Sequence, residues 1–148
     1  MVFQKRRSAS AVRGRPASAQ STGGAAAGAT TRARGERAEQ LACDYLTARG
    51  LRLLHTNFRT PGRGGGEIDL IMVDTDGTLV FVEVRQRKRA TQGGAAASIG
   101  ATKQRRIVFA ARHYLLRLPS PPLCRFDAVL LDGDPPAITW LRAAFDAA

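Results

Sequence analysis

The chain has 148 residues, and its 23 Lys and Arg against 12 Asp and Glu give it a formal net charge of +11. This length suits one domain that can bury a hydrophobic core without disulfides. No run approaches the roughly 18 apolar residues of a membrane span, and no apolar segment follows the first basic residues as a secretory signal requires. So large a positive excess favours a polyanionic partner, most commonly nucleic acid and next an acidic membrane surface, although some proteins are basic without such a partner.

The positive charge is unevenly distributed along the chain. Residues 1–34 contain seven basic residues and no acidic one, and they are otherwise mostly small. Such a segment cannot bury enough apolar surface to offset the entropy lost on ordering, so we predict a disordered basic tail. We predict one domain over residues 35–148, where 16 basic residues face 12 acidic ones. Its own affinity for nucleic acid therefore depends on where its charges lie.

Hydrophobic periodicity and turn residues predict alternating helices and strands. In chain order these are a helix over residues 35–49, strands over 51–58, 67–73 and 78–85, a helix over 102–117, and strands over 124–131 and 137–140. Basic, glycine-containing loops are predicted at 59–66 and 85–94, and a last helical turn at 141–146. Helices interspersed with apolar strands indicate an α/β fold with a central sheet covered by helices.

The two cysteines, Cys43 and Cys124, are far apart in the sequence. They form no CxxC pattern, so they do not indicate a zinc site. Because both lie in apolar segments, we expect reduced core residues. This expectation fits a cytoplasmic protein.

Three acidic residues interrupt the apolar strands on either side of the turn near residue 76. The turn carries Gly77 as its third loop residue, which favours a three-residue loop with this glycine left-handed. In that register Asp69 faces Glu83, and Glu67 faces Arg85, with opposed Cβ atoms about 5 Å apart. A two-residue loop would instead place Asp69 and Glu83 on opposite faces of the hairpin.

Two interpretations of the Asp69 and Glu83 carboxylates are open from the residues alone. Two ionised carboxylates this close repel each other, and a hard divalent cation such as Mg²⁺ would remove the conflict by binding their oxygens. Alternatively, both could pair with arginines in a structural ion network. A carboxylate in a half-buried strand needs one or the other.

Five short motifs resemble the signature of the YraN family of uncharacterised bacterial proteins, in order over residues 35–145. They are Gly35-Glu36-Arg37-Ala38, Gly66-Glu67-Ile68-Asp69-Leu70, the segment 80–87, Lys103-Gln104-Arg105-Arg106, and Arg125-Phe126-Asp127-Ala128-Val129. That family is similar to archaeal Holliday-junction resolvases and to the PD-(D/E)xK nuclease superfamily. The resemblance implies a restriction-endonuclease-like α-β-β-β-α-β core, with a mixed central sheet flanked by helices.

The resemblance also implies roles for individual residues. Asp69 matches the metal-binding Asp, Glu83 its acidic partner, and Glu36 the additional resolvase carboxylate that completes a Mg²⁺ or Mn²⁺ site. Arg85 stands where the motif has Lys. Arginine stays protonated and cannot act as a base, although it can stabilise charge on a phosphate.

The implied function is metal-dependent endonuclease cleavage of branched or flapped DNA, with Asp69, Glu83 and Arg85 as catalytic residues. The alternative is a non-catalytic nucleic-acid-binding module of the same fold, and a third hypothesis is a protein-interaction domain with an incidental basic tail. By analogy with resolvases, the chain would form a homodimer. Trp140 and the few other aromatic residues form no stacking platform that the sequence identifies. The residues expected to contact nucleic acid are Arg59, Arg63, Arg87, Lys88, Arg89, Lys103, Gln104, Arg105 and Arg106.

Overall fold

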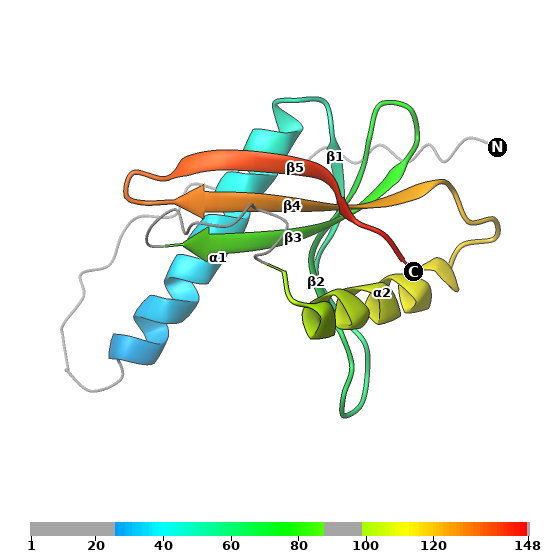
Figure 1. The fold of residues 1–148 in the computed structure, drawn as a ribbon, viewed down its shortest axis with the longest axis horizontal. Helices are drawn as coiled ribbons and strands as arrows, with labels where there is room; N and C mark the ends of the chain where they lie inside the picture. Colours follow the sequence, from blue (N-terminus) through cyan, green and yellow to red (C-terminus); the bar gives the residue numbers. More distant parts are fainter. Residues whose placement is uncertain (1–25, 88–98, 148) are drawn as a thin grey trace, which may run out of the picture.

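A computed structural model describes residues 26–87 and 99–147. Its elements are α1 (Ala26–Thr47), β1 (Arg52–Arg59), β2 (Glu67–Val73), β3 (Leu79–Arg87), α2 (Ala101–Leu115), β4 (Cys124–Asp132) and β5 (Ala137–Phe145) (Figure 1). The strands form one five-stranded sheet in the order β1-β2-β3-β4-β5. β3 and β4 are parallel and joined through α2, whereas the other neighbours are antiparallel. The predicted mixed α/β fold is confirmed.

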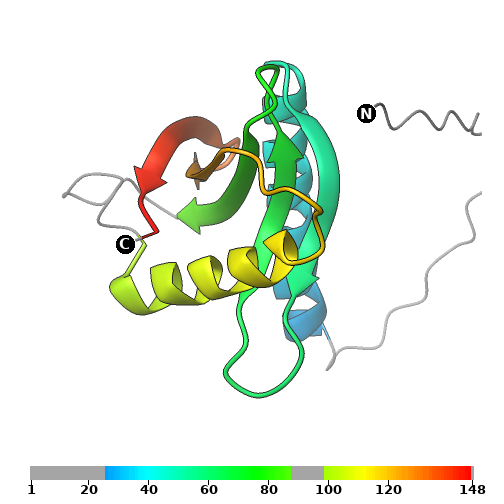
Figure 2. The ribbon, with the colours of Figure 1, turned by 90° about the vertical axis from the view of Figure 1, so that its right-hand side faces the viewer.

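The two helices cover different parts of the core (Figure 2). α1 contributes Ala42 and Leu46 to a buried cluster that includes Val82 of β3. α2 contributes Ile107 to a second cluster that includes Phe81 of the same strand. Because helices pack on both of its faces, β3 is a continuous apolar run rather than an alternating one.

The hairpin between β2 and β3 has the predicted register. Leu70 pairs with Val82 and Val73 with Leu79, as a three-residue loop requires. Gly77 has φ +87°, the left-handed conformation that glycine adopts without steric cost. The backbone N–H of Asp74 donates to the carbonyl of Thr78 and closes the loop.

α1 begins at Ala26, well before the predicted start at Gly35. Residues 26–34 are therefore helical, in contrast to the prediction that they belong to a disordered tail, while residues 1–25 of that tail lie outside the described residues. Side chains from Thr30 to Arg37 are exposed, so tertiary packing does not explain the extension. Alanine has the highest helix propensity, and extending a formed helix avoids the cost of nucleation.

Two further predictions are corrected by the structure. β5 continues to Phe145, so residues 141–146 form no helical turn; Leu141 pairs with Ala128 of β4 and packs on the second cluster. Cys43 is buried as expected, but Cys124 is exposed at the start of β4. Neither helix in the described ranges is long and apolar enough to cross a membrane.

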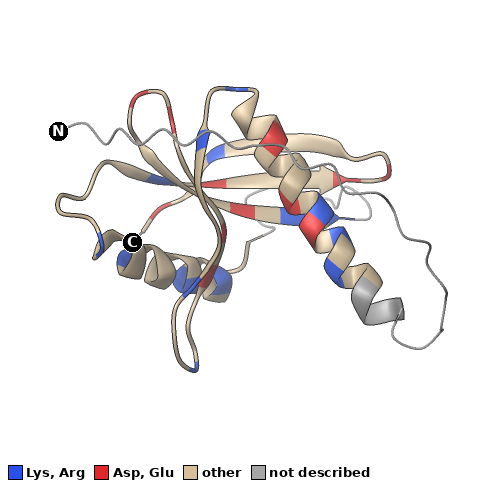
Figure 3. Cartoon of the chain, turned by 180° about the vertical axis from the view of Figure 1, so that it is seen from behind, with Lys and Arg blue, Asp and Glu red and all other residues tan. Residues whose placement is uncertain are grey.

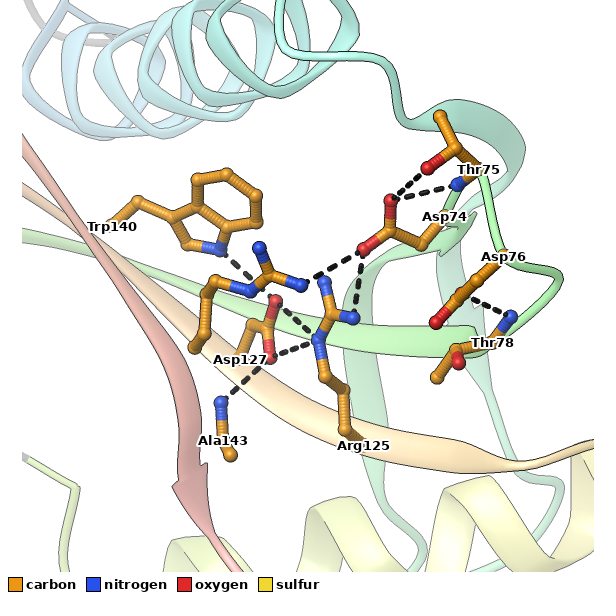
Figure 4. A network of polar contacts seen from close by, with 9 residues as sticks. Asp74, Thr75, Asp76, Thr78, Arg125, Asp127, Trp140 and Ala143 are labelled. Carbon is orange, nitrogen blue, oxygen red and sulfur yellow. Dashed lines mark hydrogen bonds and ion pairs between the residues drawn. The ribbon is translucent and has the colours of Figure 1, made fainter.

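A buried polar network joins the β2–β3 turn to β4 and β5 (Figure 4). Asp127 is fully buried and accepts hydrogen bonds from Arg125 Nε (3.0 Å), Trp140 Nε1 (3.0 Å) and the backbone N–H of Ala143 (2.9 Å). Arg125 also forms an ion pair of 2.8 Å with Asp74. Ala143 has φ +49° at an irregularity in the β4–β5 register. This motif aspartate therefore stabilises the fold.

Candidate functional site

The central sheet opens between β2 and β3. The hairpin ladder ends at the Leu70–Val82 pair. Beyond it, β2 remains paired with β1 as far as Glu67, and β3 remains paired with β4 as far as Arg87. The two strands thus separate into a fork, which is visible where β2 turns away from β3 in Figure 2. The next residue on each strand is a carboxylate.

Those carboxylates, Asp69 and Glu83, are the predicted pair. The backbone N–H of Val84 donates to Asp69 Oδ2 at 2.8 Å. This side-chain oxygen takes the place of a backbone carbonyl of β2, which is no longer paired with β3 here. Burial, followed by the negative charge of Glu83, raises the pKa of Asp69 to about 7. The two carboxylates therefore repel each other in a poorly solvated place.

Glu83 is only 5% exposed. Its Oε1 lies 3.4 Å from Nζ of Lys103 on α2, whereas its buried Oε2 receives no hydrogen bond while Asp69 is ionised. A buried carboxylate oxygen without a partner is costly. It is the kind of group that a cation or a bound water satisfies.

These residues fit a divalent cation within limits. Mg²⁺ is typically held by one or two carboxylates together with water and substrate oxygens. Asp69 and Glu83 can supply the two carboxylates. Within residues 26–87 and 99–147, no group of three His, Cys, Asp or Glu side chains is arranged to hold a metal. The fork thus provides a two-carboxylate site rather than a closed protein cage.

The two other charged residues predicted on the hairpin do not form a facing pair. Glu67 lies beyond the end of the ladder and forms an ion pair of 3.2 Å with Arg59 of β1, so the prediction that it faces Arg85 is wrong. Arg85 is half-buried on β3, two residues after Glu83. Residues two apart on a strand share a face, which keeps this guanidinium near the fork.

On α1, the structure favours Glu39 over the predicted Glu36. Glu36 is exposed and forms an ion pair of 3.1 Å with Arg32 of the same helix. Glu39 accepts a hydrogen bond of 3.1 Å from Asn57 Nδ2, and burial raises its pKa, with a further contribution from the charge of Asp69. Glu39 is therefore the carboxylate on α1 that is electrostatically linked to the fork.

A sequence signal for Glu39 existed. It precedes Ala42 by three residues and Leu46 by seven, which places a carboxylate on the apolar stripe of the helix. The family resemblance instead points to Glu36, which belongs to the motif Gly35-Glu36-Arg37-Ala38.

The basic residues predicted to bind nucleic acid fall into distinct groups. Lys103 reaches the fork, while Gln104 donates to the carbonyl of Ile99 at 2.8 Å and fastens the start of α2. Arg87 extends β3 and forms two hydrogen bonds, of 2.7 and 2.9 Å, with Asp132, so it has a structural partner. Arg59 is engaged with Glu67. Arg63, Arg105 and Arg106 are exposed, and Lys88 and Arg89 lie outside the described residues.

A close backbone contact brings the β1–β2 loop to α2. A Cβ atom added at Gly66 would lie 1.9 Å from the carbonyl oxygen of Arg106. Only glycine permits this approach. The basic loop that carries Arg63 is consequently anchored beside α2, on which Lys, Arg and no acidic residues are found (Figure 3).

Comparison with known proteins places the chain in a family. Residues 38–131 match the model of "Uncharacterised protein family UPF0102". A protein named "UPF0102 protein" from Paracidovorax citrulli (strain AAC00-1) is 70% identical over 125 residues, covering 84% of this chain and 91% of that protein. A protein of the same name from Acidovorax sp. (strain JS42) is 64% identical over 125 residues, covering 84% and 93%.

The family match agrees with the uncharacterised bacterial family that the sequence motifs resemble. The matched segment includes Glu39, Asp69, Glu83 and Arg85 and begins after Glu36. More distant in identity is a "UPF0102 protein" of Polaromonas naphthalenivorans (strain CJ2), 62% identical over 135 residues, covering 84% of this chain and 88% of that protein. The chain therefore belongs to the uncharacterised protein family UPF0102.

Proposed function

We propose that this protein is a metal-dependent nuclease that hydrolyses phosphodiester bonds, and that its centre is the fork between β2 and β3. One observation carries the proposal. Glu83 is buried with an oxygen that receives no hydrogen bond while Asp69 is ionised, next to this aspartate, whose pKa is raised to about 7. Perturbed carboxylates of this kind are characteristic of functional sites.

The residues at the fork suggest how such a site is assembled. Asp69 and Glu83 would hold Mg²⁺ or Mn²⁺, and Glu39 would act on this two-carboxylate site through its charge interaction with Asp69 rather than as a third metal ligand. The bound ion supplies Lewis-acid activation of water and of the phosphate. Binding of the substrate and stabilisation of the charge on its phosphate would come from neighbouring side chains.

One cation contacts Glu83, and a second lies two residues after it on β3. Lys103 Nζ lies 3.4 Å from Glu83 Oε1 and its side chain is partly exposed, so it can contact a substrate phosphate entering from solvent. Arg85 on β3 would stabilise negative charge that develops on the phosphate, a role that needs no proton transfer. The similarity to resolvases favours DNA as the substrate.

The test is cleavage of labelled flapped and branched DNA in Mg²⁺, Mn²⁺ or EDTA by the wild type and by Glu83→Gln. Asp44→Asn is the matched control, because Asp44 is an exposed α1 carboxylate bonded to Gln40. We expect metal-dependent cutting that is lost in Glu83→Gln and kept in Asp44→Asn. Calorimetric titration with Mn²⁺ should show binding to the wild type that Glu83→Gln weakens. Equal cleavage by all three proteins would reject the proposal.

A second candidate is a non-catalytic nucleic-acid-binding module. It is favoured by Arg85 at the motif lysine position and by the absence of a three-ligand metal cluster among the residues that the structure describes. It predicts binding that weakens steeply with salt, persists in EDTA, and is accompanied by no cleavage of any substrate.

A further inference from the structure

The outward face of α2 carries uncompensated positive charge. The helix contains Lys103, Arg105, Arg106 and Arg112 and no Asp or Glu. The three arginines are exposed, and within the described part of the chain none forms an ion pair with a carboxylate. α1, in contrast, carries both signs (Figure 3). The outward face of α2 therefore suits the phosphates of a polyanion.

An aromatic residue lies in the middle of this charge. Phe109 is 46% exposed, and its ring centroid lies 4.6 Å from that of His113. Arg105 is four residues before it and Arg112 three after it, so both are neighbours of its ring on the helix surface. Ile107 and Ala110 take the buried side of the helix. Phe109 is thus a solvent-facing π surface bordered by guanidinium groups.

Aromatic rings among basic side chains are the means by which proteins bind single-stranded nucleic acid. Bases stack on the rings while the basic groups hold the backbone, and the contact tolerates any base. A second copy of this chain fits the same surface poorly. It would place two acid-free basic helices face to face, so their arginines would repel each other.

The surface is also close to the proposed centre. Lys103, which contacts Glu83, is six residues before Phe109 on the same helix, about 9 Å along the axis. This axial separation corresponds to about two or three nucleotides of a stacked strand, at roughly 3.4 Å each.

We propose that Phe109, backed by His113, is a stacking platform for an unpaired base, with Arg105, Arg106 and Arg112 holding the adjacent phosphates. The preferred substrate is then nucleic acid with a single-stranded segment beside the cleavage point. This inference rests on the proposed function for the nature of the partner. It goes further by proposing that the protein selects single-stranded over double-stranded nucleic acid.

The experiment measures equilibrium binding of a labelled single-stranded oligonucleotide and a blunt duplex, both in EDTA so that cleavage plays no part. Phe109→Ala should weaken single-strand binding about tenfold and leave duplex binding unchanged. Leu116→Ala, which shortens another exposed apolar side chain just after α2, should change neither. Phe109→Trp should retain binding and show fluorescence quenching with the single strand, beyond the signal of the wild type, whose one tryptophan is Trp140.

Several outcomes would overturn the platform. These are equal loss of single-strand and duplex binding in Phe109→Ala, no loss of either, or a dimer-to-monomer change in sedimentation that identifies the face as a contact between copies. Failure of the nuclease is separable, because selective single-strand binding without cleavage keeps the platform and rejects the enzyme. Cleavage without a preference for single strands would keep the enzyme and reject the platform.

Discussion

The backbone N–H of Val84 donates a 2.8 Å hydrogen bond to Oδ2 of Asp69 at the point where β2 and β3 separate. The bond lets the sheet open without leaving that N–H unsatisfied. It also fixes the aspartate beside Glu83. The opening of the sheet and the pairing of the carboxylates are therefore two consequences of one arrangement.

The first prediction concerns pH. Because the pKa of Asp69 is raised to about 7 in the folded chain from an ordinary 3.8, the native state binds this proton more tightly than the unfolded state does. The stabilisation that comes from this proton on Asp69 is fully present below about pH 4 and is lost as the pH rises through 7. Asp69→Asn should remove this dependence and stabilise the protein at pH 8 by about 2 kcal/mol. Urea unfolding at pH 5 and pH 8 measures it.

The same experiment has an internal check. Addition of Mn²⁺ should raise the unfolding midpoint of the wild type more at pH 8 than at pH 5, since ligands bind metal in their deprotonated form. Asp69→Asn should show little response to the metal. A variant with the same pH slope as the wild type would show that another group causes it.

The second prediction separates the two glutamates of α1, Glu36 and Glu39. Glu39→Gln should weaken Mn²⁺ binding roughly 10-fold or more, the usual effect of losing a metal-supporting group, because its charge interacts with that of Asp69. Glu36→Gln removes an exposed carboxylate that pairs with Arg32 and should change the affinity little. Calorimetric titration of both variants decides, and the opposite ranking would return the role to Glu36.

Local sequence patterns predicted the hairpin well but not the fork. Gly77 indicates the loop length, and the loop length determines that Leu70 pairs with Val82 and that Asp69 and Glu83 come next. Nothing local indicates where the ladder stops. That point depends on β2 following β1 while β3 follows β4, so Glu67 pairs with Arg59 rather than facing Arg85.

Long-range partners explain the other differences. The sequence places Arg87 in a loop, whereas the structure places it at the end of β3. Its partner there, Asp132, is 45 residues away in the sequence, so no local pattern indicates the contact. The sequence predicts a helical turn at 141–146, whereas these residues extend β5. One group that holds them there, the Asp127 carboxylate that accepts the Ala143 N–H, lies on the neighbouring strand, where no local pattern indicates it. Helical periodicity could have identified Glu39, and the same periodicity leaves Phe109 outside the apolar stripe that contains Ile107 and Ala110.

The third prediction tests the buried network. Asp127→Ala leaves the mostly buried Arg125 guanidinium with its remaining ion pair to Asp74 and removes the acceptors of Trp140 and Ala143. It should lower the free energy of unfolding by about 3 kcal/mol. Arg125→Ala should have a similar effect, and the double variant should lose less than the sum, because the two residues share one network. Additive losses in urea unfolding would show that they act independently.

The last prediction concerns the contact between the β1–β2 loop and α2. Gly66→Ala would place a Cβ atom 1.9 Å from the Arg106 carbonyl oxygen, so the start of β2 must move away from the helix, at a cost of roughly 1–3 kcal/mol. Gly35→Ala is the matched control, since it lies in α1 with no atom within 4 Å of its added Cβ. That substitution should stabilise the protein by about 0.5–1 kcal/mol. Because β2 carries Asp69, Gly66→Ala should also weaken Mn²⁺ binding, whereas Gly35→Ala should leave it unchanged. Equal stability changes in the two variants would show that the contact at Gly66 does not hold the loop against α2.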